Sequence, residues 1–443
     1  MKSYIRNIRD GSDAGATGGI ITTKSNTGST SGDVIVKSRH EIWVSAEAGA
    51  IAAAANGAIA GGAGAIGAAI ARNYIGYGFN DENVSQYHED ADNSAVNPSG
   101  NDNGELDQRE ETDYANRMAE AGSLQNTSES YIEDATLAVG GDLLVRADMI
   151  QTAQTKGYAG SLAVAISIGG AVAAAGAEST TKFSSKVRSE LINVSGSVAG
   201  NVSILSNVSS NITAAHAYGA SLAGGLVGVS VGVAYIDVDF ANQVISRIDG
   251  GTSASQFLIG GDVEVKADVT ANNAHGLDAV VASVAAGAVA IAGGGLVMLI
   301  DVDNTVISEI VGDAVVVAAG DIDVLAHEQS SSVALAVNTS VAIGISGASA
   351  VGVSVVLVRS VSEVTARVGR AENENGQTVS GETPSISAND ITVMAWADTR
   401  LSDVTTGAIS GSLGIAVAVN TATAILNTRV QAYTYQSTLS ATN

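Results

Sequence analysis

The residues best suited to chemistry lie in an acidic stretch from residue 81 to residue 120, which holds twelve acidic side chains and two arginines. Within it, oxygen-bearing side chains recur at short intervals in one twelve-residue segment: Ser99, Asn101, Asn103, Glu105, Asp107 and Glu110. Carboxylate and amide oxygens are the ligands that Ca²⁺ prefers. The segment is therefore either a calcium site or a plain solvated acidic loop, and calcium is the only cofactor that the sequence suggests.

The order of these residues resembles the twelve-residue calcium loop of EF-hand proteins. Gly104 stands at the sixth position, where that loop turns sharply, and Glu110 ends the segment with a carboxylate that can bind through both oxygens. The first position departs from the pattern, because Ser99 stands where the family has Asp. A stretch that favours helix, Leu106–Ala119, follows, but no entering helix precedes the segment. We expect the acidic insert to be partly helical.

Two glycine motifs match nucleotide-binding and hydrolase patterns. Gly62–Gly67 has the spacing of a dinucleotide-binding loop, and Gly228–Gly232 has that of a nucleophile elbow. A chain with 51 glycines produces such matches by chance. Neither motif is flanked by the change from strand to helix that the chemistry needs, so no catalytic or cofactor-binding residue is expected.

The remaining candidates are histidines and carboxylates. The histidines fall at irregular places relative to the repeats, which predicts ordinary surface or turn residues: His40, His88, His216, His275 and His327. Four carboxylates follow apolar stretches and are expected at exposed turns, with cation binding between coils as the alternative: Asp237, Asp239, Asp301 and Asp303.

A short signature recurs along the chain: an acidic residue or Asn, then alternating apolar positions ending in Ala or Ser. It begins at Asp33, Asp142, Asn201, Asp262, Asp321 and Asp390. The spacings are 109, 59, 61, 59 and 69 residues, so the period is near 60, with a large insert in the first gap and a short one in the last. Repetition at such a period is typical of stacked architectures.

The signature divides the chain into repeats. Residues 1–32 are the end of a preceding repeat plus a Gly/Ser/Thr-rich insert. The later units are 33–141 with the acidic insert at about 80–122, 142–200, 201–261, 262–320, 321–389 with a short insert at about 371–384, and 390–443. Both ends of the chain fall at repeat seams, and no signal-peptide-like segment opens it. We therefore expect a piece of a longer array.

Composition excludes other classes of protein. The net charge of −24 disfavours binding to nucleic acid, and the absence of cysteine excludes disulfides and Cys-based metal sites. With 46% hydrophobic residues but only 4% aromatics, the apolar content is mainly Ala, Val and Ile. Such residues suit closely stacked strands.

Each repeat contains a long uncharged run, at 48–71, 159–177, 217–236, 279–300 and 333–358. These runs are long enough for membrane-spanning helices, but small and polar residues interrupt them and no basic flank follows. We expect buried strands covered on both faces, and no membrane span. The first run is richer in Ala and Gly, and helix and strand both remain open for it.

Two further elements recur. Val-Asn-Thr closes an apolar run at 337–339 and again at 419–421, and Ser-Tyr-Ile precedes a signature at 130–132. Together with the signatures, these elements resemble the repeat of bacterial leukotoxin-type filamentous adhesins, a family of giant repetitive surface or secreted proteins. The resemblance implies a β-helical shaft, an extracellular or bacterial cell-surface location and adhesion to host or cell-surface glycans or proteins. It does not imply toxicity.

We therefore expect an all-β chain forming an elongated β-solenoid of about 60-residue repeats. With two or three coils per period stacked at ~4.8 Å, five periods would give a rod of roughly 50–70 Å. The expected function is a non-catalytic structural or adhesive shaft whose partners are neighbouring repeats or copies of itself end to end. The alternatives are a self-assembling fibre subunit, a polysaccharide lyase or epimerase, and a membrane-inserting toxin segment.

Overall fold

The computed structural model of the chain describes residues 2–6, 19–22, 32–56, 62–76, 125–165, 169–251, 256–273, 277–369 and 383–442. The regular structure in these ranges is β-strand, arranged in parallel sheets. The prediction of an all-β chain is confirmed. The acidic insert, with its predicted helix, lies outside the described residues.

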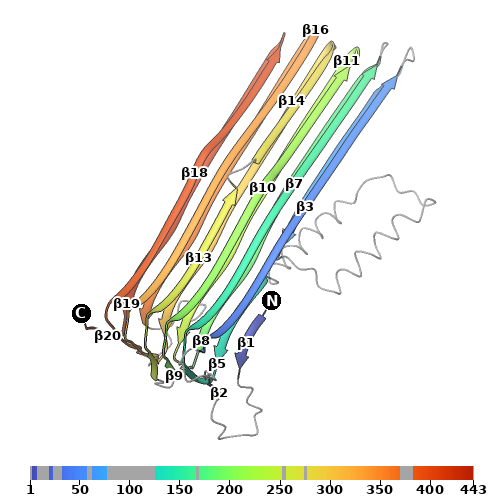
Figure 1. The fold of residues 1–443 in the computed structure, drawn as a ribbon. Coiled ribbons are helices and arrows are strands. Elements are labelled where there is room, and N and C mark those ends of the chain that lie inside the picture. Colours follow the sequence, from blue (N-terminus) through green and yellow to red (C-terminus); the bar gives the residue numbers. More distant parts are fainter. Residues whose placement is uncertain are drawn as a thin grey trace, which may run out of the picture.

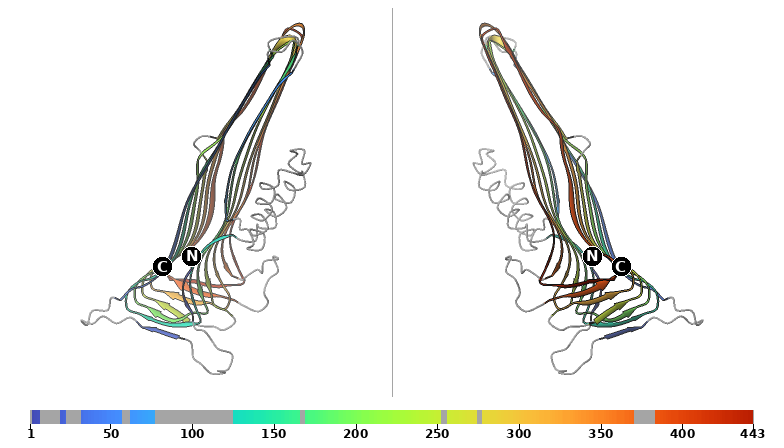
Figure 2. Two further views of the ribbon diagram at one scale, coloured as in Figure 1. Left: turned by 90° about the vertical axis from the view of Figure 1, so that its right-hand side faces the viewer. Right: turned by 90° about the vertical axis from the view of Figure 1, so that its left-hand side faces the viewer.

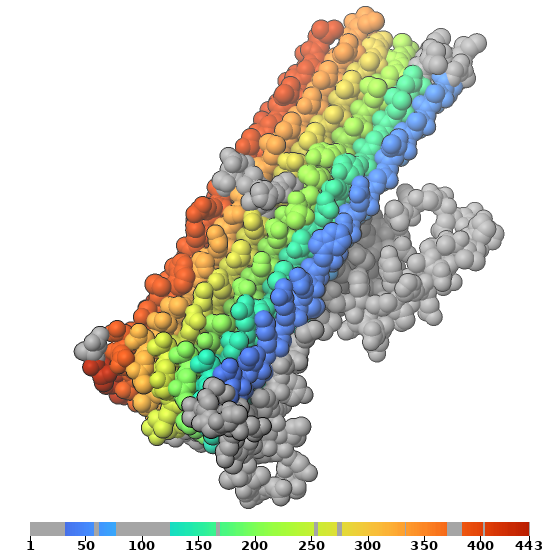
Figure 3. Space-filling model, in the orientation of Figure 1, coloured from blue at the N-terminus to red at the C-terminus, as the bar shows by residue number. Residues whose placement is uncertain are grey.

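Each repeat contributes one rung, which we define as two long strands followed by one short strand (Figures 1 and 2). The first long strands lie side by side on one face: β3 (Val34–Asn56), β7 (Leu143–Ala165), β10 (Val202–Gly224), β13 (Val263–Asn273), the beginnings of β14 (Leu277–Val311) and β16 (Ile322–Gly369), and β18 (Ile391–Ser412). Figure 3 shows this order across the face, from the first rung in blue to the last in red.

The chain then turns back and forms a second face. It consists of β1 (Lys2–Arg6), β4 (Ala63–Ile75), β5 (Asn126–Glu133), β8 (Gly170–Ile192), β11 (Val227–Asp249), the later parts of β14 and β16, and β19 (Ile415–Tyr435). Short strands form a separate sheet across the base: β2 (Gly19–Thr22), β6 (Ala135–Val139), β9 (Ser195–Val198), β12 (Gln256–Ile259), β15 (Val315–Ala318), β17 (Ser385–Ala388) and β20 (Thr438–Ala441).

Neighbouring rungs pair in register at an offset of one repeat. Val202 of β10 faces Leu143 of β7 on one side and Val263 of β13 on the other. One period therefore makes one rung, and the expectation of two or three coils per period is wrong. The reason is that each apolar run continues the signature strand or its return partner as a single strand, such as the 23 residues of β11.

The proportions of the molecule follow from this register. Six rungs at ~4.8 Å stack to only about 25 Å, whereas a strand of about 23 residues is about 75 Å long. The predicted rod of roughly 50–70 Å is thus replaced by a flat, tall shape that is short along the stacking axis (Figures 1 and 2).

The side chains between the two faces become smaller away from the base. Near the base the core contains branched residues such as Ile204 and Val265. Further along, Phe183 and Phe240 stack with ring centroids 5.2 Å apart. At the far end two clusters of buried residues consist of alanine alone. Because alanine lets sheets approach more closely than branched side chains do, the two faces converge toward the end where the strands turn back, which we call the tip (Figure 2).

The uncharged runs are strands on either side of the tip. Residues 48–56 and 63–71 belong to β3 and β4, so the first run is strand and not helix in its described part. The expectation that both faces of these strands are covered is wrong, because their outward side chains are exposed: Val231 is 41% exposed and Ile291 is 46% exposed. Among the described residues, no helix is long and apolar enough to cross a membrane.

The corner between the second long strand and the short strand uses left-handed backbone. Asp134 and Asn193 have φ values of 52° and 51°, and Gly251 and Gly312 have positive φ in later rungs. Asn, Asp and Gly tolerate this conformation best. The Asn193 side-chain amide donates a hydrogen bond to Oδ1 of Asp134 at 2.7 Å, which links the corners of two rungs.

Candidate functional site

The first residue of each signature joins one rung to the next. Oδ1 of Asp142 accepts a hydrogen bond from the backbone N–H of Asn201 at 2.7 Å, and Oδ1 of Asn201 accepts one from the N–H of Asp262 at 2.9 Å. The same bond joins Asp33 to Asp142, Asp262 to Asp321, and Asp321 to Asp390. We call this row the seam ladder. Asp and Asn both fit it because both place an acceptor oxygen at the same distance from the backbone.

The glycine before the signature residue is explained by the seam ladder. A Cβ on Gly200 would overlap Oδ1 of Asp142, and a Cβ on Gly320 would overlap Oδ1 of Asp262. At the last seam Asn389 takes the glycine's place, and its amide donates to the carbonyl oxygen of Ala319 at 2.9 Å. The recurring Gly-Asp pair therefore has a steric and hydrogen-bonding origin.

A second row of polar residues crosses the other face near the base. Glu190, Arg247, Glu309 and Arg367 occupy one register position in four successive rungs, and we call them the ion ladder. Stacking in register places each side chain next to its counterpart about 4.8 Å away. The signs alternate along the row, so every charge has an opposite charge as its neighbour.

The contacts of the ion ladder are close and buried. Arg247 Nη1 lies 3.7 Å from Glu190 Oε1, and Arg247 Nε donates to Glu309. Arg367 Nε donates to the second oxygen of Glu309 at 2.6 Å, and Glu309 is 0% exposed. Burial alone lowers the pKa of Arg247, but Glu309 and Glu190 outweigh it and raise the pKa above its ordinary value. The arginine therefore stays charged.

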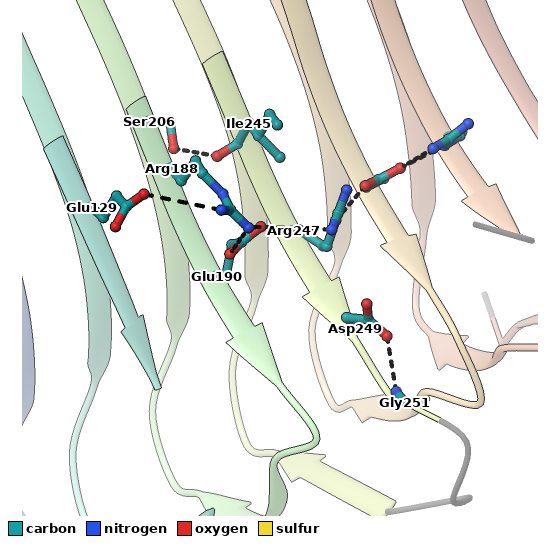
Figure 4. A network of polar contacts seen from close by, with 10 residues as sticks. Glu129, Arg188, Glu190, Ser206, Ile245, Arg247, Asp249 and Gly251 are labelled. Atoms are coloured by element: carbon teal, nitrogen blue, oxygen red, sulfur yellow. Dashed lines mark hydrogen bonds and ion pairs between the residues drawn. The ribbon is translucent and has the colours of Figure 1, made fainter. Parts of the chain in front are cut away.

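The ion ladder continues beyond these four residues. At one end Arg188 lies 2.7 Å from Glu190 and 4.0 Å from Glu129 (Figure 4). At the other end Arg367 Nη1 donates to the hydroxyl of Tyr433 at 3.2 Å. Buried ion pairs of this kind add little net stability but make alternative pairings costly. The row can therefore fix which rung follows which.

The four carboxylates Asp237, Asp239, Asp301 and Asp303 lie on the outward side of the second face. Two of them are engaged by basic side chains: Arg359 Nε donates to Asp301 at 3.0 Å, and Lys182 Nζ lies 3.0 Å from Asp237. Loss of hydration and the nearby charge of Asp301 raise the pKa of the Asp303 carboxyl, with Arg359 opposing them.

A shallow cleft lies beside Asp237, Asp239 and Asp301. Its volume of about 170 Å³ is below the roughly 300–1,000 Å³ of ordinary ligand pockets. Within the described residues, no group of three or more His, Asp or Glu side chains is arranged to hold a metal ion. Asp237 and Asp301 are thus ion-pair partners on this surface.

Three of the five histidines lie in the described ranges, and they form no row. The ring of His216 stacks on Tyr218, and His327 stacks on Trp396 while bonding to Asp268 at 3.0 Å. The two glycine motifs lie inside β4 and β11 apart from Gly62, which just precedes β4. At Gly228 a Cβ would overlap the carbonyl oxygen of Ala286, as expected for a packing glycine.

The predicted calcium segment, Ser99, Asn101, Asn103, Glu105, Asp107 and Glu110, lies outside the described residues. Calcium binding there stays a prediction.

In comparisons with protein-family models, curated proteins and solved structures, the chain has no significant match.

The seam ladder and the ion ladder were not expected as such. The signal for the first was the Gly before each Asp, which a period of 60 places in one row. The signal for the second was the order Glu190, Arg247, Glu309, Arg367, whose spacings of 57, 62 and 58 residues match the period. Both rows become visible only when the repeats are aligned with one another.

Proposed function

We propose that the chain is a β-solenoid segment that serves as a structural and adhesive shaft in an extracellular or cell-surface filamentous protein of the leukotoxin-type adhesin kind. The observation that carries the proposal is the in-register pairing of equivalent strands at an offset of one repeat. Each rung contacts chiefly the rungs before and after it, so length can grow by adding rungs without a new core.

The polar rows suit a shaft that must keep its order. The seam ladder ties successive rungs together at the base of the first face, and the ion ladder does so on the second face. A rung that paired with the next rung but one would bring like charges of the ion ladder together. These contacts resist sliding between rungs, which is the deformation that a shaft meets under load.

Adhesion would be carried by segments displayed at the side of the shaft, and the acidic insert after β4 is the proposed one. Calcium bound to the insert would leave the rungs unchanged. The shaft and the displayed segment are therefore separate parts of the proposal.

Pulling single molecules by their two ends tests the shaft. In a stack with nearest-neighbour contacts we expect rungs to peel off one at a time, with force peaks separated by about 200 Å for a repeat of about 60 extended residues. Glu309→Gln should lower the peaks of the two rungs it joins and leave the others in place. A single all-or-none event, or unfolding without measurable force, would contradict the proposal.

A further inference from the structure

The outer surface near the tip is apolar, while the inner surface there is made of small residues. Exposed Val, Leu and Ile side chains point outward from successive rungs, among them Leu222, Val231, Val233, Ile291, Ile343 and Ile345. Ile345, at the turn of the β16 rung, is 93% exposed. Contiguous apolar surface of this kind is rare on a protein surrounded only by water.

This apolar surface covers both faces and the turn between them. Leu222 lies on β10 of the first face, whereas Val231 lies on β11 of the second face, and the chain crosses between them at Gly225 and Leu226. Figure 2 shows that the two faces meet at the tip, so the apolar surface wraps around a thin edge. A partner protein would have to cover both sides of this edge.

Charged side chains mark the end of the apolar surface at one level in several rungs. On the first face Lys156, His216 and Asp278 are register partners. On the second face Asp239, Asp301 and Arg359 are register partners. We call these two rows the belt. Between the belt and the tip, the described residues of these rungs carry no Asp, Glu, Lys or Arg apart from Asp237, two residues from the belt, and Glu178, four residues from the belt level at Lys182 and ion-paired with Arg72.

Tyrosines lie beside the belt on the side of the tip. Tyr158 and Tyr218 are neighbours on the first face, with ring centroids 5.4 Å apart, and Tyr235 lies on the second face. Tyrosine is enriched where a protein passes from the headgroups of a membrane into its hydrocarbon, because the ring is apolar and the hydroxyl is polar.

The height of the apolar part matches a bilayer. Residues 217–224 lead from the belt to the tip, and residues 227–236 lead back as far as Asp237, two residues short of the belt at Asp239. Eight to ten extended residues span about 26–33 Å, and the hydrocarbon core of a bilayer is about 30 Å thick.

The backbone groups inside the tip have partners within the protein, whereas the side-chain oxygens Ser161 Oγ, Asn338 Oδ1 and Ser340 Oγ are buried there without a hydrogen-bond partner. The backbone of β11 pairs with β8 on one side and β14 on the other through all 23 of its residues. Between the faces, the hydroxyl groups of Ser221 and Ser230 lie 2.7 Å apart, and Ser230 also donates to the carbonyl oxygen of Ser221 at 2.9 Å. Structures enter hydrocarbon only when their backbone bonds are made internally. The inner rungs meet that condition, and the edge strands β3, β4, β18 and β19 would meet it once further rungs pair with them.

We propose that the tip inserts from one side into the hydrocarbon of a zwitterionic phospholipid bilayer, with the belt at the headgroups. The charge pattern of the molecule follows that of such a bilayer, because the tip is uncharged and the belt carries both signs. A second copy of the chain fits less well, since it would cover one face of a two-sided edge and leave the other exposed.

Flotation with phosphatidylcholine vesicles tests the insertion. We expect the wild-type chain to float with the vesicles and Ile291→Lys and Ile345→Lys each to weaken partitioning by about 30-fold, the factor for the ~2 kcal/mol that a lysine costs deep in a bilayer. Thr270→Lys, on the outward side of β13 below the belt, adds the same charge and should float like the wild type. Far-UV circular dichroism and melting temperature confirm that the three variants fold alike.

A fluorescent label gives the depth. The chain has no cysteine, so Ile345→Cys and Thr270→Cys can each carry one environment-sensitive label. Brominated phosphatidylcholine should quench the label at 345 and not the label at 270. Lack of flotation by the wild type, equal flotation of all lysine variants, or an unquenched label at 345 would overturn the proposal. So would a dimer that buries this label and persists in the presence of excess lipid.

Discussion

In a stack of parallel strands in register, each side chain lies beside its counterpart from the next repeat, and this selects the residues that recur. An Asp or Asn whose oxygen accepts the next backbone N–H fits such a row, as at Asp142 and Asn201. A row of identical buried charges does not fit, and Glu309 accordingly lies between Arg247 and Arg367. The two ladders are thus two ways of placing polar side chains directly beside one another in neighbouring rungs.

The seam ladder predicts a difference between two substitutions at one position. Asp142→Ala removes the acceptor for the N–H of Asn201 and should lower the free energy of unfolding by about 0.5–1.5 kcal/mol, the usual net worth of one hydrogen bond. Asp142→Asn keeps the acceptor, as Asn201 does naturally, and should be close to neutral. Urea unfolding followed by circular dichroism measures both. Equal losses would show that the bond does not matter.

The ion ladder predicts a large effect from removing one charge. Glu309→Gln leaves Arg247 and Arg367 facing each other in a buried place, so we expect a loss of about 3 kcal/mol or more in unfolding free energy. The matched control is Glu363→Gln, on β16 of the same face. Glu363 and its ion-pair partner Arg429 are 47% and 63% exposed. An exposed pair of this kind contributes about 1 kcal/mol at most. Similar losses in both variants would argue against the burial of the ion ladder.

The sequence predicted which residues recur in each repeat, but it did not predict what all of them contact. The signature at Asp142 and its equivalents was visible in the sequence, yet the acceptor role of the side chain was not, because it depends on the register between rungs. The carboxylates Asp237 and Asp301 were expected at exposed turns. They lie within strands, because β11 and β14 continue past the end of the apolar runs.

At the scale of elements, the long strands near the tip carry small residues on their inner side and large apolar residues on their outer side. This is the reverse of an ordinary core, where the large apolar residues point inward. Ala292 of β14 points inward and is 1% exposed, while Ile291 beside it points outward. Small inner residues let the two faces converge, and the outward positions take the large apolar residues. The strand period of two fixes both rows at once.

Overpacking the inner row tests this arrangement. Ala292→Leu adds three carbon atoms between faces that are held together by alanine and should cost about 1–3 kcal/mol of unfolding free energy. Ala282→Leu, at an outward position of the same strand, should change it by less than about 0.5 kcal/mol. Urea unfolding distinguishes them. A neutral Ala292→Leu would mean that the two faces are not in close contact there.

The sequence predicted strands for the later apolar runs, but it did not predict that the outward side chains of these strands are exposed. A continuous run of apolar and small residues is typical of a strand covered on both faces, and that was the expectation for residues 279–300. The outcome differs because the large residues of the run all fall on one side where it nears the tip. Ala alternates with Val289 and Ile291 within 288–292, and this alternation already indicates one side of small residues and one side of large ones.

At the scale of the whole molecule, the repeats build a flat body whose long dimension follows the strands. The period near 60 and the seams predicted the stacking, but the number of coils per period depends on where the chain turns, and small residues allow a turn at many places. The first and last rungs, β3 with β4 and β18 with β19, leave the outer edges of their strands open in the described chain. Open parallel edges favour pairing with further rungs, either of the same chain or of another copy.

The central claim is the register of one rung on the next, and spin labels measure it directly. Ser203 of β10 and Glu264 of β13 are register partners, so nitroxide labels at Ser203→Cys and Glu264→Cys should lie about 5 Å apart at the backbone and show strong dipolar broadening. Labels at Ser203→Cys and Asn272→Cys, eight residues further along β13, are about 26 Å apart along the strand and should give the spectrum of isolated labels. Broadening in the first pair alone would confirm the stacked rungs; its absence there, or equal broadening in both pairs, would contradict them.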